Sequence, residues 1–244
     1  PDGVTSIGYS AFENCSALTS VTIPDGVTSI SEYAFYNCSS LTSITIPDGV
    51  TSIGEYAFYN CSSLTSITIP DNITSINTKT FYNCSSLMSL TIPDSITSIG
   101  KSAFEGCNNL EKITIPFIGA SKTASNGYAR VFGYIFGYTI SSTQSIDDAT
   151  LQYFFDKKYY HYYIPKTLTT VVIGNTADII PYSAFYNCNN VTNITIGEGV
   201  TSIDDYAFTG CNSLTSVTLP DGVTSIGYSA FENCSALTSV TIPD

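Results

Sequence analysis

The sequence predicts a mostly-β solenoid, a chain wound into stacked coils, and three observations predict it. One phrase, typified by LTSITIPDGVTSIGEYAFYNCSS at residues 41–63, recurs along most of the 244 residues. Short stretches of this phrase alternate polar and apolar residues, and a proline-containing turn follows them. Periods of roughly 20 to 50 residues are typical of solenoids, propellers and arrays. The step between repeats is 23 residues, as the cysteines show: Cys15, Cys38, Cys61, Cys84 and Cys107, then Cys188, Cys211 and Cys234.

The first element of each repeat is a strand, exemplified by residues 43–46. Ser43 and Thr45 alternate with Ile44 and Ile46, and this pattern is typical of a strand with one buried and one solvated face. The Pro-Asp-Gly sequence at residues 47–49 then predicts a turn, because proline fixes φ, aspartate bonds its own backbone and glycine accepts positive φ.

The rest of the repeat turns back toward the core. Val50 and Ile53 predict a second short extended segment, and Ala57, Phe58 and Cys61 suit a tight 3₁₀-like corner that fills the interior. A single coil buries too little apolar surface to offset its conformational entropy, so the coils must stack. The apolar residue that begins each strand marks nine coils: Leu18, Leu41, Leu64, Leu87, Leu110, Leu168, Val191, Leu214 and Leu237. We therefore expect one solenoid over residues 1–244.

An aromatic-rich insert interrupts the repeat at about residues 116–165. Leu110 and Leu168 are 58 residues apart where 23 are expected, yet the repeat resumes in phase on both sides. The insert contains FGYIFGY at residues 132–138 and LQYFFDKKYYHYYIP at residues 151–165, which holds the only histidine of the chain. Asp147 and Asp148 favour the start of a short helix.

The pattern LxxIxIPxxVxxIxxxAFxxC resembles the BspA-like leucine-rich repeat family of bacterial and protozoan surface proteins, and some members of this family carry a similar FGYIFG insert. The resemblance implies a right-handed solenoid with a parallel sheet on its concave side and short strands or 3₁₀ turns on its convex side. It also implies a secreted or cell-surface location and adhesion to host matrix proteins or other microbes. The family supplies no shared catalytic residues.

Composition and charge exclude several classes of partner. The formal net charge is −12, which disfavours binding to nucleic acid or to an anionic membrane surface. No apolar run approaches the roughly 20 residues of a membrane span. Pro1 lies in the middle of a repeat, so we expect a fragment whose export signal, if it has one, lies elsewhere.

The candidate chemical groups each have a structural explanation. The cysteines share one phase, so stacking brings them within disulfide range, but parallel side chains favour free buried thiols. The aspartates that follow the repeated prolines are typical of turns, with Ca²⁺ binding as the alternative. No sequence motif combines His161 with a catalytic nucleophile or acid, and no second histidine or CxxC pair supports zinc. The sequence therefore predicts no enzyme activity, metal or cofactor.

Two surfaces are candidates for binding a protein or a glycan. One is the polar strand face, represented by Thr45, Thr68 and Thr91, which also suits a simple solvated surface. The other is the aromatic run, since tyrosine is enriched at recognition sites; the alternative is that these rings cover the insert's own core. Its candidate interaction residues are Phe154, Phe155, Tyr159, Tyr160, His161, Tyr162 and Tyr163.

Residues 1–25 and 220–244 are identical, and neither stretch resembles a capping repeat. A longer protein that repeats a 219-residue unit and a truncated or engineered chain both explain this identity. An unpaired parallel edge is a template for another chain. The alternative function is therefore a structural one, in which copies assemble end to end into a fibre or surface layer.

Overall fold

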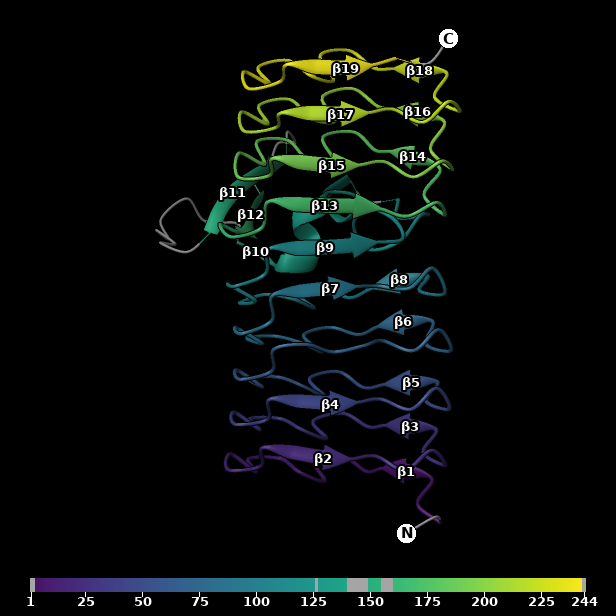
Figure 1. Ribbon diagram of the computed structural model, residues 1–244, viewed down its shortest axis with the longest axis vertical. Coiled ribbons are helices and arrows are strands. Elements are labelled where there is room, and N and C mark those ends of the chain that lie inside the picture. Colours follow the sequence, from purple (N-terminus) through teal and green to yellow (C-terminus); the bar gives the residue numbers. More distant parts are fainter. Residues whose placement is uncertain (1–2, 126, 140–148, 155–159, 243–244) are drawn as a thin grey trace.

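The protein is a stack of parallel coils in the computed structural model, which describes residues 3–125, 127–139, 149–154 and 160–242 (Figure 1). The chain advances by one strand spacing per repeat, so residues 23 apart in the sequence are neighbours in register. The predicted mostly-β solenoid is confirmed.

The main strands run along one side of the stack. Six of them form one parallel sheet, and β2 pairs with β4 further toward the N-terminal end. The coil between these two sheets has no named strand but a parallel bridge between Ser43 and Ser66. The six-stranded sheet has the order β7-β9-β13-β15-β17-β19. The bounds are β2 Ser20–Thr22, β4 Ser43–Thr45, β7 Ser89–Thr91, β9 Lys112–Ile115, β13 Thr170–Ile173, β15 Asn193–Thr195, β17 Ser216–Thr218 and β19 Ser239–Thr241.

A second row of two-residue strands follows the turn of each coil. These strands pair in three short parallel sheets, β1-β3-β5, β6-β8 and β14-β16-β18. Each strand presents its isoleucine on the core side, except at the partly exposed β18. The bounds are β1 Ser6–Ile7, β3 Ser29–Ile30, β5 Ser52–Ile53, β6 Ser75–Ile76, β8 Ser98–Ile99, β14 Ile179–Ile180, β16 Ser202–Ile203 and β18 Ser225–Ile226.

The corner of each coil consists of single turns. In one coil, the Cys61 N–H donates to the Phe58 carbonyl at 3.3 Å and the Tyr59 N–H donates to the Tyr56 carbonyl at 3.1 Å. Tyr56 and Asn60 have positive φ, 58° and 56°, so the three-residue spacing of a 3₁₀ helix is present but no continuous helix forms. Asparagine tolerates this left-handed conformation better than most residues.

The asparagines of these corners form a ladder. The Nδ2 of Asn37, Asn60 and Asn83 each donates to the Oδ1 of the preceding asparagine at 2.8 to 2.9 Å. The ladder ends at Gly106, where a Cβ would overlap the Asn83 side chain. These bonds run along the stack and tie successive corners together.

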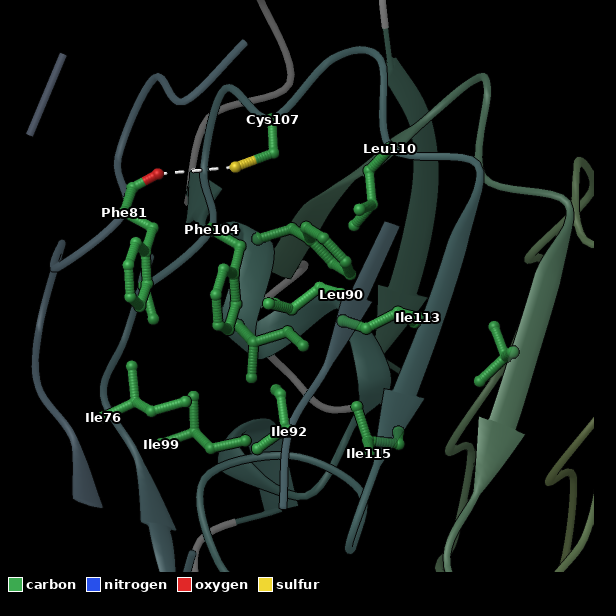
Figure 2. Packing of buried hydrophobic residues seen from close by; sticks show 14 of the residues in the cluster. Ile76, Phe81, Leu90, Ile92, Ile99, Phe104, Cys107, Leu110, Ile113 and Ile115 are labelled. Atoms are coloured by element: carbon green, nitrogen blue, oxygen red, sulfur yellow. Dashed lines mark hydrogen bonds between the residues drawn. The ribbon is translucent and has the colours of Figure 1, made fainter. Parts of the chain in front are cut away.

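Phenylalanine rings form a column in the core. Phe12, Phe35, Phe58, Phe81 and Phe104 stack with centroid distances of 5.1 to 5.6 Å and nearly parallel planes. Figure 2 shows two of these rings beside the isoleucines and leucines of both strand rows. Each regular coil therefore buries the same set of side chains against the same neighbours.

The cysteines sit beside this column as thiols. All eight are free, and Cys15 is the one with an exposed side chain. Most donate to the phenylalanine carbonyl of the coil before, as Cys107 does to Phe81 at 3.4 Å (Figure 2). Burial raises the pKa of Cys38 to about 11 and that of Cys107 to about 12. The prediction of free, buried, structural thiols is confirmed for seven of the eight cysteines, whereas Cys15 is free but exposed.

The insert forms a small antiparallel sheet and two 3₁₀ helices. β12 (Tyr160–Pro165) lies between β10 (Tyr138–Thr139) and β11 (Ala149–Phe154). The 3₁₀ helices η1 (Gly127–Ala129) and η2 (Phe132–Phe136) precede this sheet. The prediction of a short helix starting at Asp147 and Asp148 is wrong for the part of it that the structure describes, because Ala149 and the residues after it form strand β11 and pair with β12. Asp147 and Asp148 themselves lie outside the described residues.

Candidate interaction surfaces

The exposed face of the main strands carries three rows of short polar side chains. In a regular coil these are a threonine, a serine and a second threonine, as at Thr42, Ser43 and Thr45. The strand register places equivalent residues side by side, for example Thr91 beside Thr114. The predicted residues Thr45, Thr68 and Thr91 are all exposed on this face. Their side chains therefore serve no core packing.

The rows change composition near the insert. Met88 and Glu111 replace the first threonine, Lys112 and Asn193 replace the serine, and Val172 replaces the second threonine. The register aligns Lys112 with Thr170 and Thr170 with Asn193, so the changes lie on adjacent strands. We call these five residues the sheet patch. The Met88 side chain is 52% exposed and adds a large apolar group to this otherwise polar face.

A groove of about 660 Å³ lies at the carboxyl ends of β7, β9, β13 and β15. In regular coils an aspartate-containing turn projects here, but after β9 the chain continues into Phe117 and Ile118, which are buried. The missing turn leaves space between neighbouring turns. We call this the turn groove; its lining includes Asp71, Asp94, Thr114, Val172, Asn175 and Glu198.

A residue of the next coil, Thr176, bonds to both preceding coils beside the turn groove. The Thr176 hydroxyl donates to the Pro116 carbonyl at 2.9 Å and lies 3.4 Å from Asp94 Oδ1. The rim carries carboxylates, whereas the buried side chains of Ile92 and Ile173 lie beneath it. Val172 and Thr114 line both this groove and the edge of the sheet face, so the turn groove and the sheet patch form one continuous surface.

The insert completes a coil instead of interrupting it. The Phe104 N–H donates to the Ile135 carbonyl of η2, and the Phe132 N–H donates to the Ala184 carbonyl of the next coil, at 2.9 and 2.8 Å. η2 thus occupies the place of a regular corner. Pro165 takes the place of a cysteine, because the Leu168 N–H donates to its carbonyl as Leu110 does to that of a cysteine.

Gln152 of β11 fastens the insert sheet to the solenoid. Its side chain is fully buried, and its Oε1 accepts from the Gly133 N–H at 2.6 Å. Its Nε2 donates to the carbonyls of Ala184 at 2.6 Å and Ser183 at 3.3 Å. A buried amide with all these partners is stabilising, and its loss would leave the Gly133 N–H without this acceptor, whereas the Ala184 carbonyl would keep its bond from the Phe132 N–H. No periodic pattern in the sequence marks this residue as buried.

Tyr162 is also a core residue. Its side chain is fully buried and its hydroxyl donates to the Tyr128 carbonyl at 2.7 Å. Burial raises the pKa of this phenol well above its ordinary value. Gly133 must lack a side chain, because a Cβ there would overlap the Cβ of Tyr162. The alternative interpretation of the aromatic run, packing within the insert, holds for this ring.

The other aromatic candidates are divided. Tyr160 is half-buried, and its ring lies 5.2 Å from that of Tyr128 and 5.0 Å, edge-on, from that of Tyr138. Lys101 Nζ lies 3.8 Å from the Tyr138 ring centroid on the side of the solenoid. His161 and Tyr163 are half-buried in β12. Phe154 ends β11, while Phe155 and Tyr159 lie outside the described residues.

A second groove, of about 620 Å³, follows the asparagine ladder. None of its lining residues is charged, and its amides already bond one another along the stack. Among the described residues, no group of three or more histidine, cysteine, aspartate or glutamate side chains is placed to hold a metal ion. The same part of the chain contains no helix long and apolar enough to cross a membrane.

Comparisons with known proteins agree with this architecture. A sequence model described as "BspA type Leucine rich repeat region" matches residues 3–128 and 155–244, in six copies. No curated protein matches the chain. The structure of a leucine-rich repeat protein from Eubacterium ventriosum overlays with a TM-score of 0.52 at 22% identity, covering 98% of this chain and 64% of that one. This likeness supports the fold.

Two further structures overlay less closely. A T. pallidum leucine-rich repeat protein gives a TM-score of 0.45 at 23% identity, covering 91% of this chain and 78% of that one. A leucine-rich cell surface protein from Faecalibacterium prausnitzii gives 0.40 at 28% identity, covering 98% and 77%.

Proposed function

Because the chain belongs to the BspA-type leucine-rich repeat family, we propose that it is a non-catalytic, cell-surface or secreted module that adheres by binding a partner protein. The binding site in this proposal is the sheet patch with the turn groove, extended by Thr91 and by the neighbouring insert. Thr45 and Thr68 lie on the unchanged part of the same face and form its periphery.

The clustering of the sheet patch carries the proposal. Exposed positions of a repeat are free of packing constraints, and elsewhere along the stack they remain threonine and serine. The departures gather on the strands β7 to β15 and at the groove between their turns. An exposed methionine beside a glutamate and a lysine offers apolar contact and charges of both signs. Protein surfaces supply the same mixture, with an apolar centre and a polar rim.

The insert supplies the second part of the proposed site. Gln152 bonds its sheet to the solenoid and Tyr162 bonds it to the preceding segment of the insert, and such preorganisation lowers the entropic cost of binding. Tyr160 and His161 are half-buried on this support, so part of each ring remains accessible. Tyr162 itself acts as support, since its side chain is fully buried.

The test returns the sheet patch to the repeat's own sequence. The triple variant Met88→Thr, Glu111→Thr, Lys112→Ser uses residues that regular coils carry at the same positions, so it should fold. Binding to immobilised fibronectin, laminin and collagen is measured by surface plasmon resonance. We expect the variant to bind at least about ten-fold more weakly, since central contacts dominate interface energies. Thr215→Ala, on the unchanged part of the face, is the matched control. Equal binding by the triple variant would contradict this site.

End-to-end self-association is a second proposal, favoured by the identity of residues 1–25 and 220–244. The last coil leaves Ile226, Tyr228 and Ile242 exposed at 38%, 70% and 65%. Contact with a second copy would cover these side chains. Sedimentation velocity over a range of concentrations tests this: growing species support assembly, and a monomer throughout contradicts it.

A further inference from the structure

Tyrosine rings stack in columns on the outer surface of the first coils. Tyr36, Tyr59 and Tyr82 form one column, with centroid distances of 4.7 and 4.5 Å and interplanar angles of 11° and 2°. A parallel column contains Tyr33 and Tyr56, 5.0 Å apart at 4°. All five side chains are half-buried, so each ring has an accessible edge.

The columns of the later coils have a different geometry. Tyr182, Tyr206 and Tyr228 also follow one another along the stack, but their rings meet edge-on. Their centroid distances are 5.7 and 5.5 Å and their interplanar angles 75° and 73°. The same protein therefore contains neighbouring tyrosines in two arrangements, stacked and edge-on.

We propose that the stacked tyrosines, above all Tyr59 and Tyr82, are a site of oxidative tyrosine–tyrosine coupling that links adjacent coils covalently. When two rings are parallel and one is displaced from the other by a short translation, the distance between equivalent carbons of the two rings is about the same as the distance between their centroids. In a biaryl joined at the carbons next to the hydroxyl-bearing carbon, the ring centres lie at nearly this separation. Coupling requires the rings to rotate out of the stack but to translate little.

The oxidant is hydrogen peroxide acting through a haem peroxidase. The peroxidase removes one electron and one proton from each phenol, which gives two phenoxyl radicals and converts one peroxide to two waters. The two ortho carbons then form a carbon–carbon bond. The hydrogen on each of these carbons leaves as a proton and each oxygen regains one, which restores both phenols. The net change is the loss of two hydrogen atoms from the protein.

The surroundings favour coupling within the columns. Burial, followed by the charge of Glu105, raises the pKa of Tyr82, and burial also raises that of Tyr59. Both phenols are therefore neutral at neutral pH, and oxidation removes the proton together with the electron. The ring centroids of Tyr56 and Tyr59 lie 5.9 Å apart, so a radical formed in one column has a neighbouring phenol in the other.

The experiment treats the dilute protein with a peroxidase and hydrogen peroxide. Intact mass and size-exclusion chromatography identify monomer that has lost two hydrogens, and peptide mapping locates the link. We expect the peptide joining Tyr59 to Tyr82 in at least about ten-fold excess over any peptide joining Tyr206 to Tyr228, because the parallel rings at 4.5 Å hold their equivalent carbons closer together than the edge-on rings at 5.5 Å do, and intramolecular reaction depends on such orientation.

Two phenylalanine variants keep the packing and remove one phenol each. Tyr59→Phe should abolish the links to Tyr82 and Tyr36, whereas Tyr206→Phe, in the edge-on column, should leave the Tyr59–Tyr82 link unchanged. Coupling only between separate molecules would overturn the proposal. An equal yield of the edge-on link would overturn it as well.

Discussion

The regular coils and the coil that carries the insert fill the same core in different ways. In a regular coil each buried side chain lies on its equivalent in the coil before, as Phe58 does on Phe35 at 5.3 Å. In the insert-bearing coil the corresponding contacts come from residues without a counterpart, chiefly Gln152 and Tyr162. Repetition distributes stability along the stack, whereas the insert concentrates it in a few contacts.

The regular coils and the insert-bearing coil also differ in their exposed residues. Away from the insert, regular coils repeat the exposed threonines and serines of the main strands along with their buried residues, so this face is uniform there. The insert removes one projecting turn and opens the turn groove, with the sheet patch beside it. The irregular coil is therefore the place where the solenoid acquires a surface of its own, and four changes to the molecule test this contrast.

Raising the pH should have the largest effect, and it should act on the regular coils. Burial favours the neutral, protonated thiol, so the pKa is higher in the folded chain than in the unfolded chain. The stability that this burial contributes is complete below the unfolded-state pKa of 9.0, and it is lost as the pH rises toward the folded-state pKa. For Cys107, with a pKa raised from 9.0 to about 12, the free energy of unfolding falls by about 1.4 kcal/mol per pH unit in that interval. Several buried thiols act together, and urea denaturation at pH 8 and above measures the sum.

The insert-bearing coil provides the internal control for this titration, because Pro165 stands where a cysteine would be. The comparison holds between about pH 9 and pH 10, because above about pH 10 the buried Tyr162 phenol of the insert, whose pKa is raised, contributes its own loss of stability. In that interval hydrogen exchange should show loss of protection beginning in the regular coils, after correction for the intrinsic exchange rate. Uniform loss over both regions would contradict the assignment to the thiols.

Truncation of a ring in the phenylalanine column should have the next largest effect. Phe58 is fully buried between Phe35 and Phe81, so Phe58→Ala should lower the free energy of unfolding by about 3 to 5 kcal/mol through lost contacts and a cavity. Chemical denaturation measures this loss. Phe12→Ala removes a half-buried ring that stacks on Phe35, and it should cost less. Equal costs would show that the rings do not support one another.

Loss of the Gln152 amide should act on the insert alone. Gln152→Ala leaves the Gly133 N–H and the Ala184 carbonyl without this partner, at a cost of about 2 to 3 kcal/mol. Hydrogen exchange should show faster opening of β10 to β12, with protection of the first coils unchanged. Asn212→Ala, at an exposed position, is the control. Unchanged protection of the insert sheet in Gln152→Ala would show that other contacts hold it.

The difference between the two regions also explains what could be predicted from the sequence. Periodicity predicts the phase of the coils, the core isoleucines and the burial of Phe58, because each coil packs equivalent residues in the same way as the coil before it. Gln152 could not be predicted, since its partners in η2 and the following coil are brought to it by a fold that no repeat encodes. The sheet patch had a signal, the departure of Met88 and Lys112 from the repeat, and the 23-residue step already places their strands side by side. The strand register adds the pairing of β9 with β13 across the insert, which brings Val172 and Asn193 to the same patch.

The smallest effect should come from the exposed rows of the main strands, and it tests the argument for the binding site. Thr45 in β4 is exposed, and valine has a similar preference for strands, so Thr45→Val should change the free energy of unfolding by no more than about 0.5 kcal/mol. Ile44→Thr, one residue away on the buried face, is the matched comparison and should cost several times more. Thermal and urea unfolding measure both. A cost above about 1 kcal/mol for Thr45→Val would mean that folding constrains these rows. Folding would then explain why the repeat changes at Met88, Glu111 and Lys112, and no ligand would be needed. A negligible cost would mean that folding does not select the residues of these rows, which supports binding as the reason for the changes.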